Sequence, residues 1–243
     1  MKYRFLILLS ITVLLLSGCK AKPGPPDNSD NIVPPGPEAE LLTEKIEQMT
    51  LEEKIGQLVI VGLDGLTIDD FSQEMIDKYK VGGFILFQRN IHDSNQTIAL
   101  IDSLKKANKS NAQPLFFAVD EEGGRVSRMP GEFSKLPTNK TVGKINSEEL
   151  SFQIGELIGE ELTALGFNMN FAPVLDIDSN PKNPVIGDRS FGADSKTVST
   201  LGIATMKGIQ SQVISVVKHF PGHGDTSTDS HVGLPFVSHD MDR

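Results

Sequence analysis

The chain has 243 residues, of which 38% are hydrophobic and 23% are charged, and its formal net charge is −9. This is the composition of an ordinary globular protein with one large domain or two small ones. Because an acidic chain is a poor candidate for binding nucleic-acid phosphates, we expect no nucleic-acid partner.

Residues 1–19 have the pattern of a bacterial export signal. Lys2 and Arg4 precede an almost wholly apolar run, residues 5–16, which is too short to span a membrane comfortably. The next residues, Ser17-Gly18-Cys19, complete a pattern that resembles the lipobox, whose cysteine is lipidated and becomes the mature N-terminus. We therefore expect an exported lipoprotein, anchored to the cell membrane through a lipid on Cys19. A plain secretory signal and an uncleaved anchor helix are the alternatives.

Residues 20–40 follow as a proline-rich segment. It holds six prolines together with glycine and asparagine, so it predicts a semi-rigid tether and no packed helix. We expect the folded part of the protein to begin near Leu41 and to occupy residues 41–243.

Amphipathic stretches alternate with short apolar runs through residues 41–243. The expected helices are 41–58, 71–79, 97–108, 148–165 and 196–210, and the expected strands are 58–63, 81–87, 114–119, 167–174 and 213–217. Continuous apolar strands that alternate with helices indicate an α/β fold with a parallel sheet covered on both faces.

Charged residues follow three of these strands, at Asp120, Asp176 and Lys218. In a (β/α)₈ barrel these positions lie on the catalytic face, and in a doubly wound sheet they line the ligand crevice. No glycine-rich phosphate loop follows the first strand, which weighs against a dinucleotide fold. Because about five strand–helix units are present and a closed barrel needs eight, we expect an incomplete TIM-type barrel from a longer protein. A smaller, complete open α/β domain is the alternative.

Four of the five histidines lie between residues 219 and 239. The fifth expected strand is followed by Lys218-His219-Phe220-Pro221-Gly222-His223-Gly224-Asp225, which leads to Asp229-Ser230-His231. The two-residue spacing lets the Asp229 carboxylate orient the His231 imidazole in a tight turn. A histidine paired in this way is a good proton donor and acceptor near neutral pH, so we expect these two residues to transfer protons.

Two further clusters carry candidate binding residues. Asp120 begins the first, residues 120–128, where its carboxylate could accept hydrogen bonds from two sugar hydroxyls and Arg128 could donate to others. For Glu121 and Glu122, ion pairs within a charged loop explain the presence of the two glutamates as well as a functional role does. Arg189 in the second cluster, residues 183–191, is a candidate to line the same binding site.

Together these segments resemble glycoside hydrolase family 3, in its β-N-acetylglucosaminidase branch. The resemblance covers residues 120–128, 170–176 and 186–191, and above all the Lys-His-Phe-Pro-Gly-His-Gly run with its Asp-Ser-His. It implies a (β/α)₈ barrel that hydrolyses terminal β-linked N-acetylglucosamine with retention, in bacteria from muropeptides of peptidoglycan. Some members of the family cleave by phosphorolysis.

The resemblance also implies roles for individual residues. The acid/base of this branch is a His–Asp dyad on a mobile loop, which matches His231 and Asp229. The substrate-binding positions of the family match Asp120, Arg128, Arg189, Lys218 and His219. We therefore expect a saccharide that contains N-acetylglucosamine as the ligand, and neither a cofactor nor a metal ion.

One part of the family pattern has no match in these residues. The attacking aspartate of the family lies on a later strand, so we expect the nucleophile beyond residue 243 and an inactive 243-residue polypeptide. A non-catalytic sugar- or peptidoglycan-binding lipoprotein is one alternative, although the absence of tryptophan weakens any site built on aromatic stacking. A metal-dependent hydrolase is the other, with His219, His223, His231 and Asp225 as ligands, but Pro221 and two glycines keep the first two histidines off a common helical face.

Overall fold

The structure is a computed structural model that describes residues 37–237. The expected signal peptide, Cys19 and most of the expected tether lie outside this range. The described residues up to Lys45 and those from Ile46 onward form separate compact units, and the sheet belongs to the second. None of the helices within residues 37–237 is both long enough and apolar enough to cross a membrane.

The N-terminal helical region differs from the prediction. Helix α1 spans Pro37–Gln48 and so begins inside the expected tether, because proline is well tolerated in the first turn of a helix. The single helix expected over residues 41–58 is also wrong, since a second helix, α2, spans Leu51–Gln57. Thr50 separates the two, because its extended backbone and a reciprocal capping box with Glu53 start a new helix there.

Five parallel strands form one sheet in the order in which they occur in the chain. They are β1 (Ile60–Gly62), β2 (Gly83–Leu86), β3 (Phe116–Val119), β4 (Met169–Asn170) and β5 (Ile214–Ser215). A doubly wound sheet reverses its strand order at a switch point, whereas a barrel adds each new strand on the same side. The sequential order therefore confirms the α/β class and the expectation of about five units of a (β/α)₈ barrel.

The last two strands are shorter than the sequence predicts. Of the expected strand 167–174, only Met169–Asn170 pairs in the sheet, followed by an isolated parallel bridge between Val174 and Lys218. Pro173 lies between the two pairings, and its nitrogen has no hydrogen to donate to a ladder. The chain is therefore irregular at the sheet edge from which the polar residues project.

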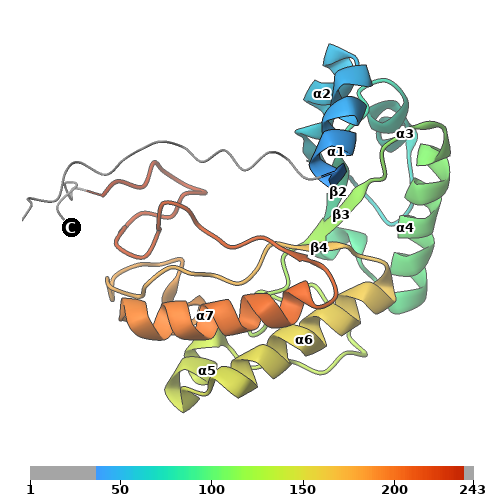
Figure 1. The fold of residues 1–243 in the computed structure, drawn as a ribbon. Coiled ribbons are helices and arrows are strands. Elements are labelled where there is room, and N and C mark those ends of the chain that lie inside the picture. Colours follow the sequence, from blue (N-terminus) through green and yellow to red (C-terminus); the bar gives the residue numbers. More distant parts are fainter. Residues whose placement is uncertain (1–36, 238–243) are drawn as a thin grey trace, which may run out of the picture. The chain divides into compact units, whose positions relative to one another are not determined.

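Helices follow the strands and cover the sheet (Figure 1). They are α3 (Asp70–Asp77), α4 (Ser94–Ala107), α5 (Asn139–Ile145), α6 (Glu148–Leu165) and α7 (Ser195–Gln210). Side chains cap the N-termini of these five helices, from Asp69, Asp93, Thr138, Ser147 and Asp194 in turn. Helix α5 was not predicted from the sequence; it is a short helix that ends at the left-handed Asn146.

The main core lies between the sheet and helices α3, α4, α6 and α7. Phe84 of β2 and Phe117 of β3 are almost completely buried there, against Ile101 of α4 and Leu162 of α6. Helices α6 and α7 lie side by side (Figure 1). This packing fixes the carboxyl ends of β3, β4 and β5 as one edge, and the candidate site is built on that edge.

Candidate active site

Three charged side chains follow neighbouring strands at the carboxyl edge of the sheet. Asp120 comes directly after β3, Asp176 follows the irregular stretch after β4, and Lys218 follows β5. Strand order alone places them side by side. The Lys218 Nζ lies 2.5 Å from the Asp120 Oδ1, although 98 residues separate the two in sequence.

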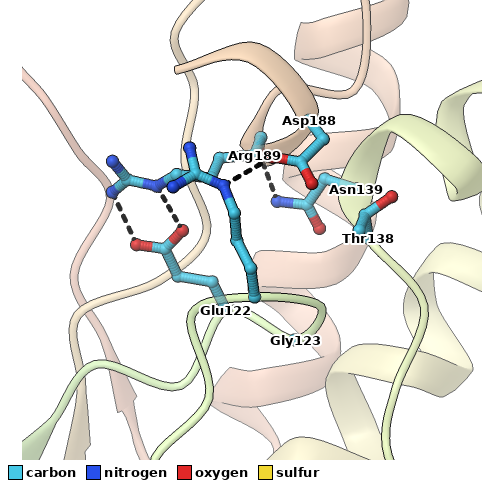
Figure 2. A pocket seen from close by; sticks show the side chains of 7 residues that line it. Glu122, Gly123, Thr138, Asn139, Asp188 and Arg189 are labelled. Atoms are coloured by element: carbon cyan, nitrogen blue, oxygen red, sulfur yellow. Dashed lines mark hydrogen bonds and ion pairs between the residues drawn. The ribbon is translucent and has the colours of Figure 1, made fainter. Parts of the chain in front are cut away.

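Glu122 lies at the centre of this charged group. Its carboxylate receives two hydrogen bonds from the Arg189 guanidinium, both at 2.8 Å, in the two-pronged geometry that arginine forms with carboxylates (Figure 2). The Lys218 Nζ lies 2.6 Å from the same carboxylate. Since the Glu122 side chain is only 1% exposed, two cations converge on a buried anion.

The charge state of Glu122 follows from its partners. Burial raises the pKa of this carboxyl, but the hydrogen bonds and charges of Arg189 and Lys218 outweigh burial and hold the pKa below its usual value. Glu122 is therefore a carboxylate at neutral pH. It fixes the positions of both cations and compensates their charge, with Asp120 as a second counter-ion for Lys218.

His219 is oriented by the carboxylate of Asp176. The His219 Nδ1 lies 2.5 Å from the Asp176 Oδ2, and the other oxygen of Asp176 accepts the backbone N–H of His223. Burial raises the pKa of Asp176, but these contacts outweigh it and leave the pKa lowered. A neutral His219 then carries its proton on Nδ1 and presents Nε2 as an acceptor, which the Arg189 Nη2 faces at 3.3 Å.

Asn183 holds the loop of Arg189 against the segment after β5. Its amide nitrogen donates to the carbonyl oxygen of His223 at 2.8 Å, and its amide oxygen accepts the backbone N–H groups of Val185 and Ile186. Because this one side chain satisfies backbone groups of both segments, it fixes the loop that carries Arg189 relative to the loop that carries His219.

The Asp229–His231 pair lies farther along the same segment and is more exposed. The His231 Nδ1 lies 2.7 Å from the Asp229 Oδ1, which also accepts the His231 backbone N–H at 2.9 Å. Both contacts lower the pKa of Asp229, and the hydrogen bond from the backbone N–H has the larger effect. The His231 side chain is 83% exposed, so its Nε2 is open to a ligand. Between β5 and residue 237 the described chain contains neither helix nor strand (Figure 1).

Arg128 lies on the loop after β3. Within residues 37–237 its guanidinium contacts no carboxylate, and its one hydrogen bond goes to the carbonyl oxygen of Ser127 at 3.1 Å. The structure thus gathers Asp120, Arg189, Lys218 and His219 into one contact network, and leaves Arg128 and His231 with polar atoms free to meet a ligand.

The comparisons with known proteins agree with this architecture. Residues 50–243 match the Glycosyl hydrolase family 3 N terminal domain. The chain belongs to glycosyl hydrolase family 3. It is 45% identical over 177 residues to Beta-hexosaminidase A of Pseudoalteromonas piscicida, a match that covers 70% of this chain and 30% of that protein.

Solved structures of family 3 proteins have the same fold. A β-N-acetylglucosaminidase from Paenibacillus sp. str. FPU-7 matches with a TM-score of 0.77 and 43% identity, over 80% of this chain and 37% of that one. NagZ from Neisseria gonorrhoeae, in complex with N-trifluoroacetyl-D-glucosamine, matches with a TM-score of 0.69 and 33% identity, over 76% of this chain and 56% of that one. The chain therefore spans roughly a third to a half of the length of these family 3 proteins.

Two histidines of the alternative metal site have hydrogen-bond partners within the protein. Among the residues of known placement, no three His, Cys, Asp or Glu side chains converge as metal ligands. His219 directs its Nδ1 at Asp176, and His223 directs its Nδ1 at the hydroxyl of Thr226, at 2.7 Å.

Two residues of the candidate site in this family 3 domain were not predicted from the sequence. Glu122 was as well explained by a loop ion pair as by function, and Asp176 had no assigned role, yet these two carboxylates orient Arg189, Lys218 and His219. The sequence could have indicated them only by their positions, since Glu122 lies two residues after Asp120 and Asp176 also follows a strand. The side chains that contact Glu122 and Asp176 come from other segments of the chain, so sequence spacing does not reveal these contacts.

Proposed function

We propose that the protein is a β-N-acetylglucosaminidase that removes terminal β-linked N-acetylglucosamine from peptidoglycan fragments. The observation that carries the proposal is the Asp229–His231 pair, with 2.7 Å between carboxylate and imidazole, in a chain of glycosyl hydrolase family 3. Its relatives support it, since those most similar to it include β-hexosaminidases and a structure with an N-acylated glucosamine.

The pair is suited to proton transfer in both halves of a retaining reaction. With Nδ1–H donated to Asp229, the Nε2 of a protonated His231 gives its proton to the glycosidic oxygen as the bond from that oxygen to the sugar carbon breaks and the attacking carboxylate of the reaction bonds to the same carbon. The neutral imidazole then takes a proton from the incoming water, whose oxygen bonds to the sugar carbon and displaces that carboxylate. Asp229 keeps the ring oriented and stabilises its positive charge in the interval.

The fixed polar network provides the saccharide site in this proposal. Asp120 accepts hydrogen bonds from sugar hydroxyls, while Lys218, Arg189 and Arg128 donate them. His219 contributes its ring edge beside Arg189. Asp176 does not serve as the attacking carboxylate, because His219 and the backbone of His223 engage its two oxygens and its side chain is fully buried.

The experiment is release of nitrophenol from a nitrophenyl N-acetyl-β-glucosaminide by the natural full-length protein. We expect His231→Asn and Asp229→Asn each to lower kcat by about 10²–10⁴-fold, as for loss of an acid/base group. His92→Asn is the matched control, because His92 is an exposed histidine 3.9 Å from Asp93 on another loop, and it should leave kcat unchanged.

Full activity in both dyad variants would contradict the assignment of the acid/base. The 243-residue chain, assayed beside the full-length protein, tests where the attacking carboxylate lies. We expect no turnover from it, and robust turnover would place the nucleophile within these residues.

We further propose that the protein is exported and held at the membrane by a lipid on Cys19. The support is the sequence of residues 1–19, with its basic start, apolar run and Ser-Gly-Cys end. Cells fed labelled palmitate should incorporate label into the natural protein and none into the Cys19→Ser variant. Equal labelling of the two would overturn the proposal.

A further inference from the structure

Glu121 is buried beneath the loop that carries Arg128. It is 1% exposed, and its two carboxylate oxygens point back at the loop that follows it. One oxygen accepts the backbone N–H of Gly123 at 3.2 Å, and the other accepts the backbone N–H of Arg128 at 2.8 Å. The side chain therefore closes the loop from within, with a bond to the backbone of the arginine itself.

Asn170 ties Glu121 to the sheet. Its amide nitrogen donates to the Glu121 carbonyl oxygen at 2.9 Å, and its amide oxygen accepts the Glu121 N–H at 3.0 Å. Asn170 is the last residue of β4 and is fully buried. The loop of Arg128 is thus anchored to the strand edge through one side chain, while the guanidinium of Arg128 stays clear of every carboxylate among residues 37–237.

Glu161 of helix α6 is an ionisable group whose charge interacts with that of Glu121. Its Oε2 is buried and has no hydrogen-bond partner among the described residues. Burial and the charge of Glu121 both raise the pKa of Glu161. Burial likewise raises the pKa of Glu121, opposed by the hydrogen bonds that the 123–129 loop donates to it, that of Arg128 foremost.

We propose that Glu121 is a positioning residue, whose carboxylate holds Arg128 in the conformation that meets the saccharide and whose protonation releases the loop. Protonation removes the negative charge of the carboxyl and turns one of its two oxygens into a donor, which weakens its hydrogen bonds from the two backbone N–H groups. Among the three residues that join the loop to the strand, Glu121 is the one that changes charge, since Arg128 is always charged and Asn170 is neutral. The inference rests on the proposed function for its ligand, but the hold of Glu121 on the loop can be measured without substrate.

The test compares two variants with the unmodified protein. In Glu121→Gln the new amide faces one of the two N–H groups as a second donor. We expect KM for the N-acetylglucosaminide to rise about 10-fold, the loss associated with one hydrogen bond to a charged group, while kcat changes little. Amide exchange at Arg128 should become faster at every pH. Glu160→Gln, on the exposed face of the same helix as Glu161, should change neither quantity.

The pH dependence of the unmodified protein separates a positioning role from a merely structural one. Protonation of Glu121 should remove protection of the Arg128 amide, measured against its intrinsic exchange rate, as the pH falls, whereas Glu121→Gln cannot ionise and should show no such loss. Unchanged KM and unchanged exchange in Glu121→Gln would overturn the inference, as would Arg128 amide protection that does not change with pH in the unmodified protein, a measurement that holds if the variant fails to fold. If the protein has no glycosidase activity, the proposed function fails, and the exchange data still decide the role of Glu121.

Discussion

Glu122 shows how one side chain determines the electrostatics of the site. Two cations, Arg189 and Lys218, lie within 2.8 Å of its carboxylate in surroundings that exclude water. Removing a single partner from such a buried group leaves opposite charges uncompensated, which costs much more than losing a surface ion pair. Asp120 forms an ion pair with Lys218 but acts on Arg189 only from a distance, so Arg189 would be the more affected cation.

We therefore expect Glu122→Gln to lower the free energy of unfolding by about 3 kcal/mol, the lower end of the range for breaking a buried ion pair. Urea denaturation followed by circular dichroism measures the change. Glu160→Gln, an exposed glutamate on α6, is the control and should stay within about 0.5 kcal/mol of the wild-type protein. An equally small change in Glu122→Gln would mean that the ion pairs make no net contribution to the free energy of unfolding.

At the scale of elements, helices α6 and α7 approach closely because glycines line their contact. A Cβ atom on Gly155 of α6 would lie 2.2 Å from the carbonyl oxygen of Thr205, and one on Gly208 of α7 would lie 2.2 Å from that of Phe152. Both obstacles are backbone atoms of the facing helix, which cannot move aside without separating the helices.

Gly155→Ala should therefore destabilise the protein by about 1–3 kcal/mol, the cost of overpacking, although Gly→Ala inside a helix ordinarily stabilises by about 0.5–1 kcal/mol. Gly202→Ala in α7 is the matched control, since its Cβ would meet the tip of the Leu175 side chain, which can rotate away. Thermal unfolding compares the two. A higher Tm in Gly155→Ala than in the wild-type protein would show that the helices separate at no cost.

Local patterns predicted most of these elements, and the exceptions have physical causes. Helix α6 matches its predicted bounds of 148–165, because an amphipathic period runs between a serine cap and Gly166. The break at Thr50 was missed because apolar residues continue through it, although the capping box was visible in the sequence. Helix α5 has too few residues for a period to emerge, and its packing beside the Arg189 turn is a tertiary contact.

At the scale of the whole molecule, the fold was more predictable than the site. Alternating strands and helices indicate a barrel because each unit is local. The contacts of the site join segments far apart, as in the 67 residues between Glu122 and Arg189, and depend on how strands stack at the sheet edge. Sequence patterns could therefore nominate Asp120, Arg189 and Lys218, while the carboxylates that hold them in place became identifiable only from the structure.

The edge of the sheet at β1 lies beside an exposed apolar groove. Within the described residues β1 pairs with β2 alone, and an apolar groove of about 580 Å³ opens beside it between α2 and α3. Ile55, Phe71 and Tyr79 line the groove and are each about half exposed, which is unusual for large apolar side chains that gather in one place.

The protein should consequently bind the apolar dye anilinonaphthalene sulfonate at this groove. Ile55→Glu places a charge in the groove and should lower the dye fluorescence, because the dye loses apolar contact and is itself an anion. Leu157→Glu, an exposed apolar position on α6 outside the groove, is the control and should leave the fluorescence unchanged. Dye fluorescence in Ile55→Glu equal to that of the unmodified protein would contradict binding at this groove.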